Sequence, residues 1–367
     1  GTAAFHVNAD VADAVLRYVG ATGDDDFDRG PGLEILVETA RLWRSLGHYD
    51  DAGGYHIDGV TGPDEYDALV DDNVYTNLMA QRNLTGAADA AERHPEGARA
   101  LGVDDAEVAA WRDAANAMAR PVDARLGVTP ASQGFIGHEV WDFDHTPPED
   151  YPLLLHHPYF DLYRKQVVKQ ADLVMAIFRR GDAFSDEQKS VDFNYYESVT
   201  VRDSSLSASI QSVVAAEVGQ LDLAYDYLAD TALMDLEDHE NNTRDGLHVA
   251  SLAGTWLALV AGLAGMRDGG ATLEFSPRLP SAISRLAFGL VYRGRRVRVE
   301  VRPEETTYRV TAGEPVDVRH FGATLRVGTD RVSAATPPAR PVGPAPRQPA
   351  GRAPTRRIPP RSGMGAP

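Results

Sequence analysis

The chain of 367 residues contains no cysteine and only three lysines, Lys165, Lys169 and Lys189. The lack of cysteine excludes disulfide bonds, zinc–thiolate centres and a cysteine nucleophile. No run approaches about 18 consecutive apolar residues, so we expect no membrane-spanning helix. Acids outnumber bases, 54 to 36, and a formal net charge of −18 argues against nonspecific binding to nucleic acid. The hydrophobic content of 43% is typical of a globular protein.

The last 35 residues have a composition of their own. Residues 333–367 contain six arginines, ten prolines and no acid, so the first 332 residues alone carry a net charge of −24. This segment has few large apolar side chains and cannot bury enough surface to offset the entropy lost on ordering. We therefore expect a disordered, solvated tail, with a basic interaction segment as the alternative.

Apolar residues recur at helical spacing through most of the chain. The spacing predicts helices over residues 9–18, 33–46, 73–84, 105–118, 163–178, 206–218, 222–233 and 249–263. The absence of alternating strands between them favours an α-helical array over a repeated βα unit. From about residue 271 short alternating runs rich in Val, Leu, Phe and Tyr predict a small antiparallel sheet or sandwich. We expect a mainly α chain in three parts: a helical domain at 1–268, a β-domain at 269–332 and the tail at 333–367.

The densest loop spans residues 55–73, YHIDGVTGPDEYDALVDDN. Its Gly-Pro turn presents Asp64 and Glu65 side by side, an arrangement that can direct an acid into a site. The alternative interpretation is that these acids cap the following helix. The residues alone leave both interpretations open.

Lys165 and Lys169 are spaced to share one face of the predicted helix 163–178. Two like charges there are unfavourable unless an anion or a polar ligand lies between them, and a solvated face is the alternative. Asp203 or Ser204 could cap the helix that begins near residue 206, and a helix N-terminus with hydroxyl groups and a nearby arginine also binds anions. His248 precedes the helix 249–263, where a lone histidine is more often structural.

Five stretches in combination resemble glycoside hydrolase family 65. They are GTAAFHVNADVADAVLRYVGATGD, GYHIDGVTGPDEYDALVDDNVYTN, VVKQADLV, FNYYESVTVRDSSLS and DGLHVASLAGTWLALVAGLAGMR. They occur in the order of that family and cover about residues 1–302. The family contains inverting phosphorylases for maltose, trehalose, kojibiose and nigerose, together with some acid trehalases.

The resemblance implies an (α/α)6 barrel followed by a small antiparallel β-sandwich. The barrel would be incomplete at its N-terminal end, and we interpret the chain as the interior of a longer protein. Glu65 matches the general acid of the family, Lys169 and Gln170 match a pair that holds the sugar, and Glu197 matches a carboxylate in contact with the sugar.

The phosphate-binding region of the phosphorylases matches Ser204, Ser205 and His248. Arg202 belongs to the same stretch, at a position where the family commonly has histidine, and we include it among the candidate phosphate ligands. The resemblance implies no metal and no organic cofactor, and it implies inorganic phosphate as the co-substrate.

The implied activity is inverting phosphorolysis of an α-glucosidic disaccharide, which yields β-glucose 1-phosphate. One alternative is a trehalase-like α-glucoside hydrolase, with or without stimulation by phosphate, with Glu197 as its base. The other is an inactive fragment that binds sugar. Family members are often homodimers, and we expect a cytoplasmic protein that has no nucleic-acid or membrane partner.

Overall fold

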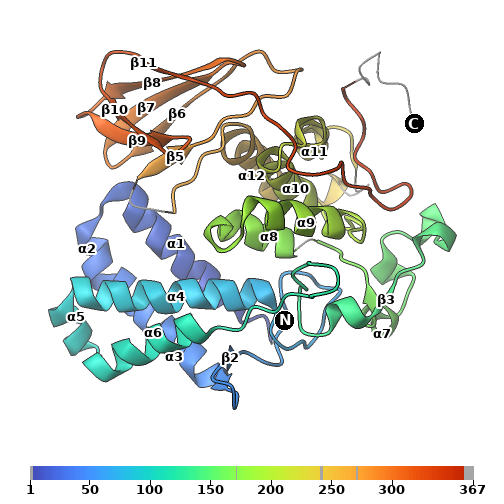
Figure 1. The fold of residues 1–367 in the computed structure, drawn as a ribbon, viewed down its shortest axis with the longest axis horizontal. Helices are drawn as coiled ribbons and strands as arrows, with labels where there is room; N and C mark the ends of the chain where they lie inside the picture. Colours follow the sequence, from blue (N-terminus) through green and yellow to red (C-terminus); the bar gives the residue numbers. More distant parts are fainter. Residues whose placement is uncertain (1–2, 171, 240–242, 270–271, 359–367) are drawn as a thin grey trace. The chain divides into compact units, whose positions relative to one another are not determined.

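A computed structural model describes residues 3–170, 172–239, 243–269 and 272–358 (Figure 1). The described chain divides into two compact units, and each is considered by itself. The first unit comprises residues 3–203 with two short stretches, 268–269 and 291–294; the second comprises the other described residues. This division differs from the predicted boundary near residue 268, because the last helices group with the β-strands.

Helices make up most of the first unit. They are α1 (His6–Thr22), α2 (Asp25–Phe27), α3 (Leu33–Leu46), α4 (Val74–Arg93), α5 (Pro95–Ala100), α6 (Asp105–Ala117), α7 (Tyr159–Leu162), α8 (Asp172–Arg179) and α9 (Asp186–Glu197). The long helix α4, cyan in Figure 1, packs against α1, α3, α6 and α8. It is therefore the central element of this unit, and the loop before it carries the candidate acid.

Helix α3 shows how the sequence determines an element. Its buried residues are Leu33, Leu36, Val37, Ala40 and Trp43, which form one helical stripe. The helix ends at Gly47, where an added Cβ would lie 2.4 Å from the ring of Tyr55. The Tyr55 hydroxyl donates to the Trp43 carbonyl at 2.8 Å, so the start of the acid-bearing loop is fastened to the end of α3.

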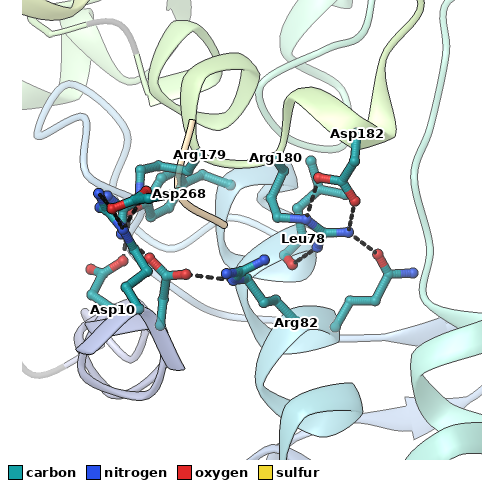
Figure 2. Close-up of polar contacts among 11 residues, drawn as sticks. Asp10, Leu78, Arg82, Arg179, Arg180, Asp182 and Asp268 are labelled. Carbon is teal, nitrogen blue, oxygen red and sulfur yellow. Dashed lines mark hydrogen bonds and ion pairs between the residues drawn. The ribbon is translucent and has the colours of Figure 1, made fainter. Parts of the chain in front are cut away.

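Ion pairs join α1, α4 and α8 (Figure 2). Asp13 of α1 is buried and pairs with both Arg82 of α4 and Arg179 of α8. Arg17 of α1 also forms a bidentate pair with Asp268, with a shortest N–O distance of 2.8 Å. Each acid thus has an arginine partner, which compensates the cost of removing its charge from water.

Two short sheets complete the first unit. Strands β1 (His48–Tyr49) and β2 (Tyr55–His56) are antiparallel, whereas β3 (Glu139–Val140) and β4 (Lys165–Gln166) are parallel. The helix predicted at 163–178 is therefore wrong over its first half. Val168 instead forms a bridge with Thr200, and these backbone pairings replace helical hydrogen bonds.

The second unit begins with helices α10 (Ser207–Glu217), α11 (Leu221–Leu233) and α12 (Val249–Leu257), the last continued by a π-helical turn at Ala258–Leu263. Two sheets follow, with strand orders β10-β9-β5 and β11-β8-β7-β6. Their strands are β5 (Leu273–Phe275), β6 (Leu286–Tyr292), β7 (Arg295–Val301), β8 (Glu305–Ala312), β9 (Val316–His320), β10 (Ala323–Val327) and β11 (Val332–Ala335). The predicted helical part followed by a small β-domain is confirmed, except that β5 pairs with β9 in parallel.

The prediction of a disordered tail differs from the structure over residues 333–358. This segment begins inside strand β11 and then follows an extended path to Ile358, with Thr336 buried. Its backbone groups and the side chain of Arg357 have hydrogen-bond partners on other elements, and these contacts need no apolar side chains. The prediction for 359–367 lies outside the described residues. Among the helices that the structure describes, none combines the length and apolarity needed to cross a membrane.

Candidate active site

The acid-bearing loop is closed at its base by backbone pairing. Val60 and Val70 exchange both of their backbone hydrogen bonds, at 3.0 and 2.9 Å. The Thr61 hydroxyl donates to the Ala68 carbonyl at 2.9 Å within the loop. At Gly62 an added Cβ would lie 2.4 Å from the Asn73 side chain, so the loop can approach the start of α4 only with glycine there.

Glu65 is an exposed residue between two buried neighbours. Its side chain is 60% exposed, whereas Asp64 and Tyr66 are buried. The Tyr66 hydroxyl donates to Asp203 Oδ2 at 2.8 Å and accepts the backbone N–H of Leu154 at 3.1 Å. The backbone on one side of Glu65 is thus fastened to segments distant in sequence.

Asp64 fastens the other side of Glu65. Its Oδ1 accepts the backbone N–H groups of Lys169 at 2.9 Å and of Gln170 at 3.3 Å. The Gln170 side-chain amide in turn donates to the carbonyl of Pro63. These contacts join the acid-bearing turn to the Lys-Gln pair along the backbone, so a cap of the following helix is not the role of Asp64. That helix is capped by Asn73, whose side chain accepts the N–H of Thr76.

Lys169 completes the group. Its ammonium forms an ion pair with Glu65 Oε2. Three residues singled out in the sequence, Glu65, Lys169 and Gln170, are therefore brought together at one place. The other lysine singled out, Lys165, lies in β4 and pairs with Glu139 at 2.5 Å, so the predicted shared helix face with Lys169 does not exist.

Three buried carboxyl groups, Asp64 and Asp67 of the loop and Asp172 at the start of α8, form a group that the sequence pattern did not predict. Burial, followed by the charges of Asp67 and Asp172, raises the pKa of Asp64 well above its ordinary value. Burial and the charge of Asp172 raise the pKa of Asp67 to about 7, and burial raises the pKa of Asp172 to about 6. Their hydrogen-bond partners include the Ser132 hydroxyl and the Asn73 amide. For Asp64 and Asp67 the acid-rich run 64–72 was the available signal.

Two further candidates lie in the first unit. Glu197 is the last residue of α9 and is buried. Arg202 is half-buried, with a left-handed backbone at φ 57°. Asp203 beside it accepts hydrogen bonds from Tyr66 and from the Leu153 backbone, and α10 begins at Ser207 without a side-chain cap from its N-cap residue. The sugar role of Glu197 and the phosphate role of Arg202 stay predictions.

Ser204, Ser205 and His248 belong to the second unit. The Ser204 hydroxyl accepts the N–H of Leu206 at 3.3 Å in a local turn. The Asp235 carboxylate accepts from both the backbone N–H of His248, at 3.1 Å, and the ring Nδ1, at 2.7 Å. An ionised carboxylate only accepts hydrogen bonds, so Nδ1 of His248 carries a proton. Nε2, the second ring nitrogen, is not the one that bonds Asp235. The phosphate role of the three residues stays a prediction. Among the described residues, no group of three or more acids and histidines is arranged to hold a metal ion.

Comparison with known proteins identifies the family. The profile of the glycosyl hydrolase family 65 central catalytic domain matches residues 1–257, and that of the family's C-terminal domain matches residues 266–327. The chain belongs to glycosyl hydrolase family 65. The first match includes the loop of Glu65, the Lys169–Gln170 pair and His248, the residues on which the resemblance to this family rests.

Individual relatives support this membership. Uncharacterized glycosyl hydrolases of Mycobacterium leprae and Mycobacterium tuberculosis are 52% identical over 351 residues, which is 95% of this chain and 44% of each relative. An α,α-trehalose phosphorylase of Geobacillus stearothermophilus is 42% identical over 338 residues, covering 90% of this chain and 44% of that enzyme. A solved structure from the human microbiome, provisionally named a kojibiose phosphorylase, superimposes with a TM-score of 0.80 at 26% identity; it covers 89% of this chain and 46% of that one. The chain thus spans less than half the length of these relatives.

Proposed function

We propose that the protein containing this chain cleaves an α-glucosidic disaccharide by inverting phosphorolysis and releases β-glucose 1-phosphate. The observation that carries the proposal is the exposed Glu65, held on a fastened turn beside Lys169 and Gln170. Glu65 acts as the general acid that protonates the glycosidic oxygen, while Lys169 and Gln170 hold the sugar in the donor subsite. The named trehalose phosphorylase relative supports this class of substrate.

The chemistry divides the work between the two sides of the sugar ring. An inverting enzyme needs an acid on the side of the leaving group and a nucleophile on the opposite face. Inorganic phosphate is itself a nucleophile, so the protein supplies hydrogen-bond donors in place of a base. Arg202, Ser204, Ser205 and His248 are the proposed donors, with phosphate as co-substrate and no other cofactor.

Lys169 has a second consequence in this proposal. Its ammonium pairs with the same carboxyl group that must donate the proton. One oxygen of Glu65 cannot accept a hydrogen bond from Lys169 as a carboxylate and also donate a proton to the glycosidic oxygen, because an ionised carboxylate only accepts. Binding of the sugar transfers the ammonium of Lys169 to sugar hydroxyls and leaves Glu65 able to carry the proton.

A second candidate function is hydrolysis. The mycobacterial relatives at 52% identity are named glycosyl hydrolases, which favours it. Water is a weak nucleophile and needs a second carboxylate to activate it. Glu197 is the candidate base for hydrolysis, and Glu65 remains the general acid in this alternative.

Product analysis on the whole gene product that carries this chain distinguishes the candidates. We would incubate it with trehalose, maltose, kojibiose and nigerose, with and without phosphate, and identify the anomer by NMR. β-Glucose 1-phosphate formed only with phosphate supports phosphorolysis, whereas free glucose as sole product supports hydrolysis. Sugar binding without turnover would favour the third interpretation, a sugar-binding protein.

The acid assignment has a matched control within the chain. Glu65→Gln is expected to lower kcat by about 100-fold or more while sugar binding persists, the usual contribution of a general acid. Glu139→Gln removes another exposed glutamate of this unit that pairs with a lysine and should leave kcat nearly unchanged. Retention of more than about 5% of activity by Glu65→Gln would remove it from this role.

A further inference from the structure

The segment after β11 runs along the second unit. We call residues 336–358 the C-terminal strap (red in Figure 1). Its first residue is fastened to the β-domain, because the Thr336 N–H donates to the Glu304 carbonyl at 2.9 Å. The hydroxyls of Thr336 and Thr306 share a buried hydrogen bond of 2.8 Å. The strap therefore starts from a fixed point in the sheet.

The middle of the strap crosses the junction between α10 and α11. The Val342 N–H donates to the Val218 carbonyl at 3.1 Å, and the Gln220 amide donates to the Gly343 carbonyl at 3.2 Å. Gly219 has a left-handed φ of 82°, and a Cβ there would lie 2.4 Å from the Arg340 carbonyl oxygen. A side chain at position 219 would thus displace the strap as well as strain the turn.

The far end of the strap reaches the segment that follows α11. The Arg357 N–H donates to Asp226 Oδ1 at 2.7 Å, and its guanidinium pairs with Glu237 Oε2 at 2.7 Å. Glu237 lies two residues after Asp235, the carboxylate that holds both the N–H and the ring Nδ1 of His248. The hydrogen bond from Arg357 lowers the pKa of Glu237, so the pair persists as the pH falls toward the ordinary range of a carboxyl group.

Charge complementarity accompanies these contacts. The strap contains five arginines and no acid. Helix α11 and the turn after it carry the acids Asp222, Asp226, Asp230, Asp235, Glu237 and Asp238. A proline-rich segment with no core of its own is thus held by backbone hydrogen bonds and by opposite charge.

We propose that the C-terminal strap is a positioning element for His248, which it holds through the Arg357–Glu237 ion pair next to Asp235. That the imidazole of His248, held in this position, binds phosphate rests on the proposed function. Arg357 is therefore a positioning residue and contacts no reactant. Loss of the ion pair frees the 234–239 turn, and His248 loses the carboxylate that fixes its ring and its tautomer.

The test compares three variants of the whole gene product: Arg357→Ala, Arg357→Lys and, as control, Arg347→Ala, which removes an exposed arginine of the same strap. The first readout is hydrogen exchange of the peptide from 234 to 249, which contains the His248 amide bonded to Asp235. Arg357→Ala should raise its exchange about tenfold, the loss expected for one charge-assisted hydrogen bond. Arg357→Lys should restore most of the protection.

The second readout is steady-state kinetics. Arg357→Ala should raise the KM for phosphate about tenfold and change the KM for the disaccharide less than about twofold. Unchanged exchange, or equal exchange in the Arg347→Ala control, would overturn the inference. Faster exchange with an unchanged phosphate KM would support the positioning of His248 and contradict its phosphate role, so failure of the inference and failure of the proposed function give different results.

Discussion

Two buried aspartates of the first unit differ in what surrounds them. Asp28 and Asp67 are equally inaccessible, each at 5% exposure. Burial opposes ionisation of Asp28, but hydrogen bonds from Arg93 and His94 outweigh it and lower the pKa of Asp28. Burial and the charge of Asp172 raise the pKa of Asp67 to about 7. The charge of the partners, together with the depth of burial, decides whether a buried acid keeps its charge.

Other buried aspartates of the first unit fall into the same two groups, those with charged partners and those with neutral partners. Asp13, like Asp28, has arginine partners, and such acids join helices to one another. Asp64 and Asp67 lie in the acid-bearing loop and Asp172 contacts its end at Asn73, and the partners of the three are neutral backbone N–H, hydroxyl and amide groups. The acids with charged partners therefore join helices, and the acids with neutral partners hold the loop and the residues next to it.

The largest expected effect is the loss of Asp13. In Asp13→Asn the guanidinium groups of Arg82 and Arg179 lose their buried carboxylate, and we expect the free energy of unfolding to fall by about 3 kcal/mol. Urea unfolding at pH 6 measures it. Asp67→Asn, the same change in the other group, should cost less than about 1 kcal/mol because the native carboxyl already carries a proton at that pH. Equal losses in the two variants would contradict the distinction.

An ion pair with one exposed acid, near the same helices, provides the control for Asp13. Asp182 is 66% exposed and pairs with Arg180 at 3.0 Å. Arg180 is buried, but its guanidinium also donates to the Leu78 carbonyl and to Gln81. Asp182→Asn should therefore cost about 1 kcal/mol, less than Asp13→Asn. A loss as large as that of Asp13→Asn would mean that exposure has no bearing on these pairs.

The second prediction concerns the pH dependence of Asp172. Its pKa rises from an ordinary 3.8 to about 6 in the folded protein, so the folded state binds more protons between these values. The stability from this group is present below the ordinary pKa and is lost as the pH rises through about 6. Asp172→Asn removes this dependence, so the free energy of unfolding of the variant should gain about 3 kcal/mol relative to the parent between pH 3 and pH 8.

Asp28→Asn should behave in the opposite way. Because the folded pKa of Asp28 is lowered, its stabilisation is present above the ordinary value and is lost as the pH falls through the folded pKa. The variant should therefore be less stable than the parent at pH 7 and approach it in acid. Chemical denaturation at several pH values measures both variants. The same direction in both would contradict the comparison.

The third prediction tests whether Asp64 works as a neutral acceptor. Asp64→Asn keeps an oxygen for the N–H groups of Lys169 and Gln170 and should retain kcat/KM within about fivefold. Asp64→Ala removes that oxygen, displaces the Lys–Gln pair from Glu65 and should lower kcat/KM about 100-fold. Steady-state kinetics on the whole gene product measure both. A loss in Asp64→Asn as large as that in Asp64→Ala would show that the negative charge is required.

The sequence predicted some of these elements and missed others for identifiable reasons. The helix at 33–46 was predicted with its observed bounds because its apolar stripe and Gly47 agree with the tertiary contacts. The predicted helix at 163–178 begins only at Asp172, because Asp64 and the strand pairing take the backbone groups before it. Helix α9 was missed, although Ser185 caps it by accepting the N–H of Gln188, a pattern visible in the sequence.

For the candidate site, too, the sequence predicted one part and missed another. The residue types of the loop were visible, but Glu65 and Lys169 lie 104 positions apart, and no local spacing brings them together. Their association came from the resemblance. The strap was missed because composition measures the capacity to form a core, whereas residues 336–358 are held by backbone hydrogen bonds and by the side chain of Arg357.

The smallest expected effect concerns the hydroxyl of Tyr66, which, unlike the buried aspartates, keeps its proton between pH 5 and pH 8. Burial and then Asp203 raise the pKa of Tyr66 far above its ordinary value, so its hydroxyl donates throughout the working pH range. Tyr66→Phe removes that donor and the acceptor for the Leu154 N–H, and should cost about 1 kcal/mol. Tyr49→Phe, which removes an exposed hydrogen bond to Asp113, should cost less than about 0.5 kcal/mol. The cost of Tyr66→Phe should be equal at pH 5 and pH 8, unlike that of Asp172→Asn. A cost that varies with pH would mean that Tyr66 is coupled to the protonation of these buried aspartates.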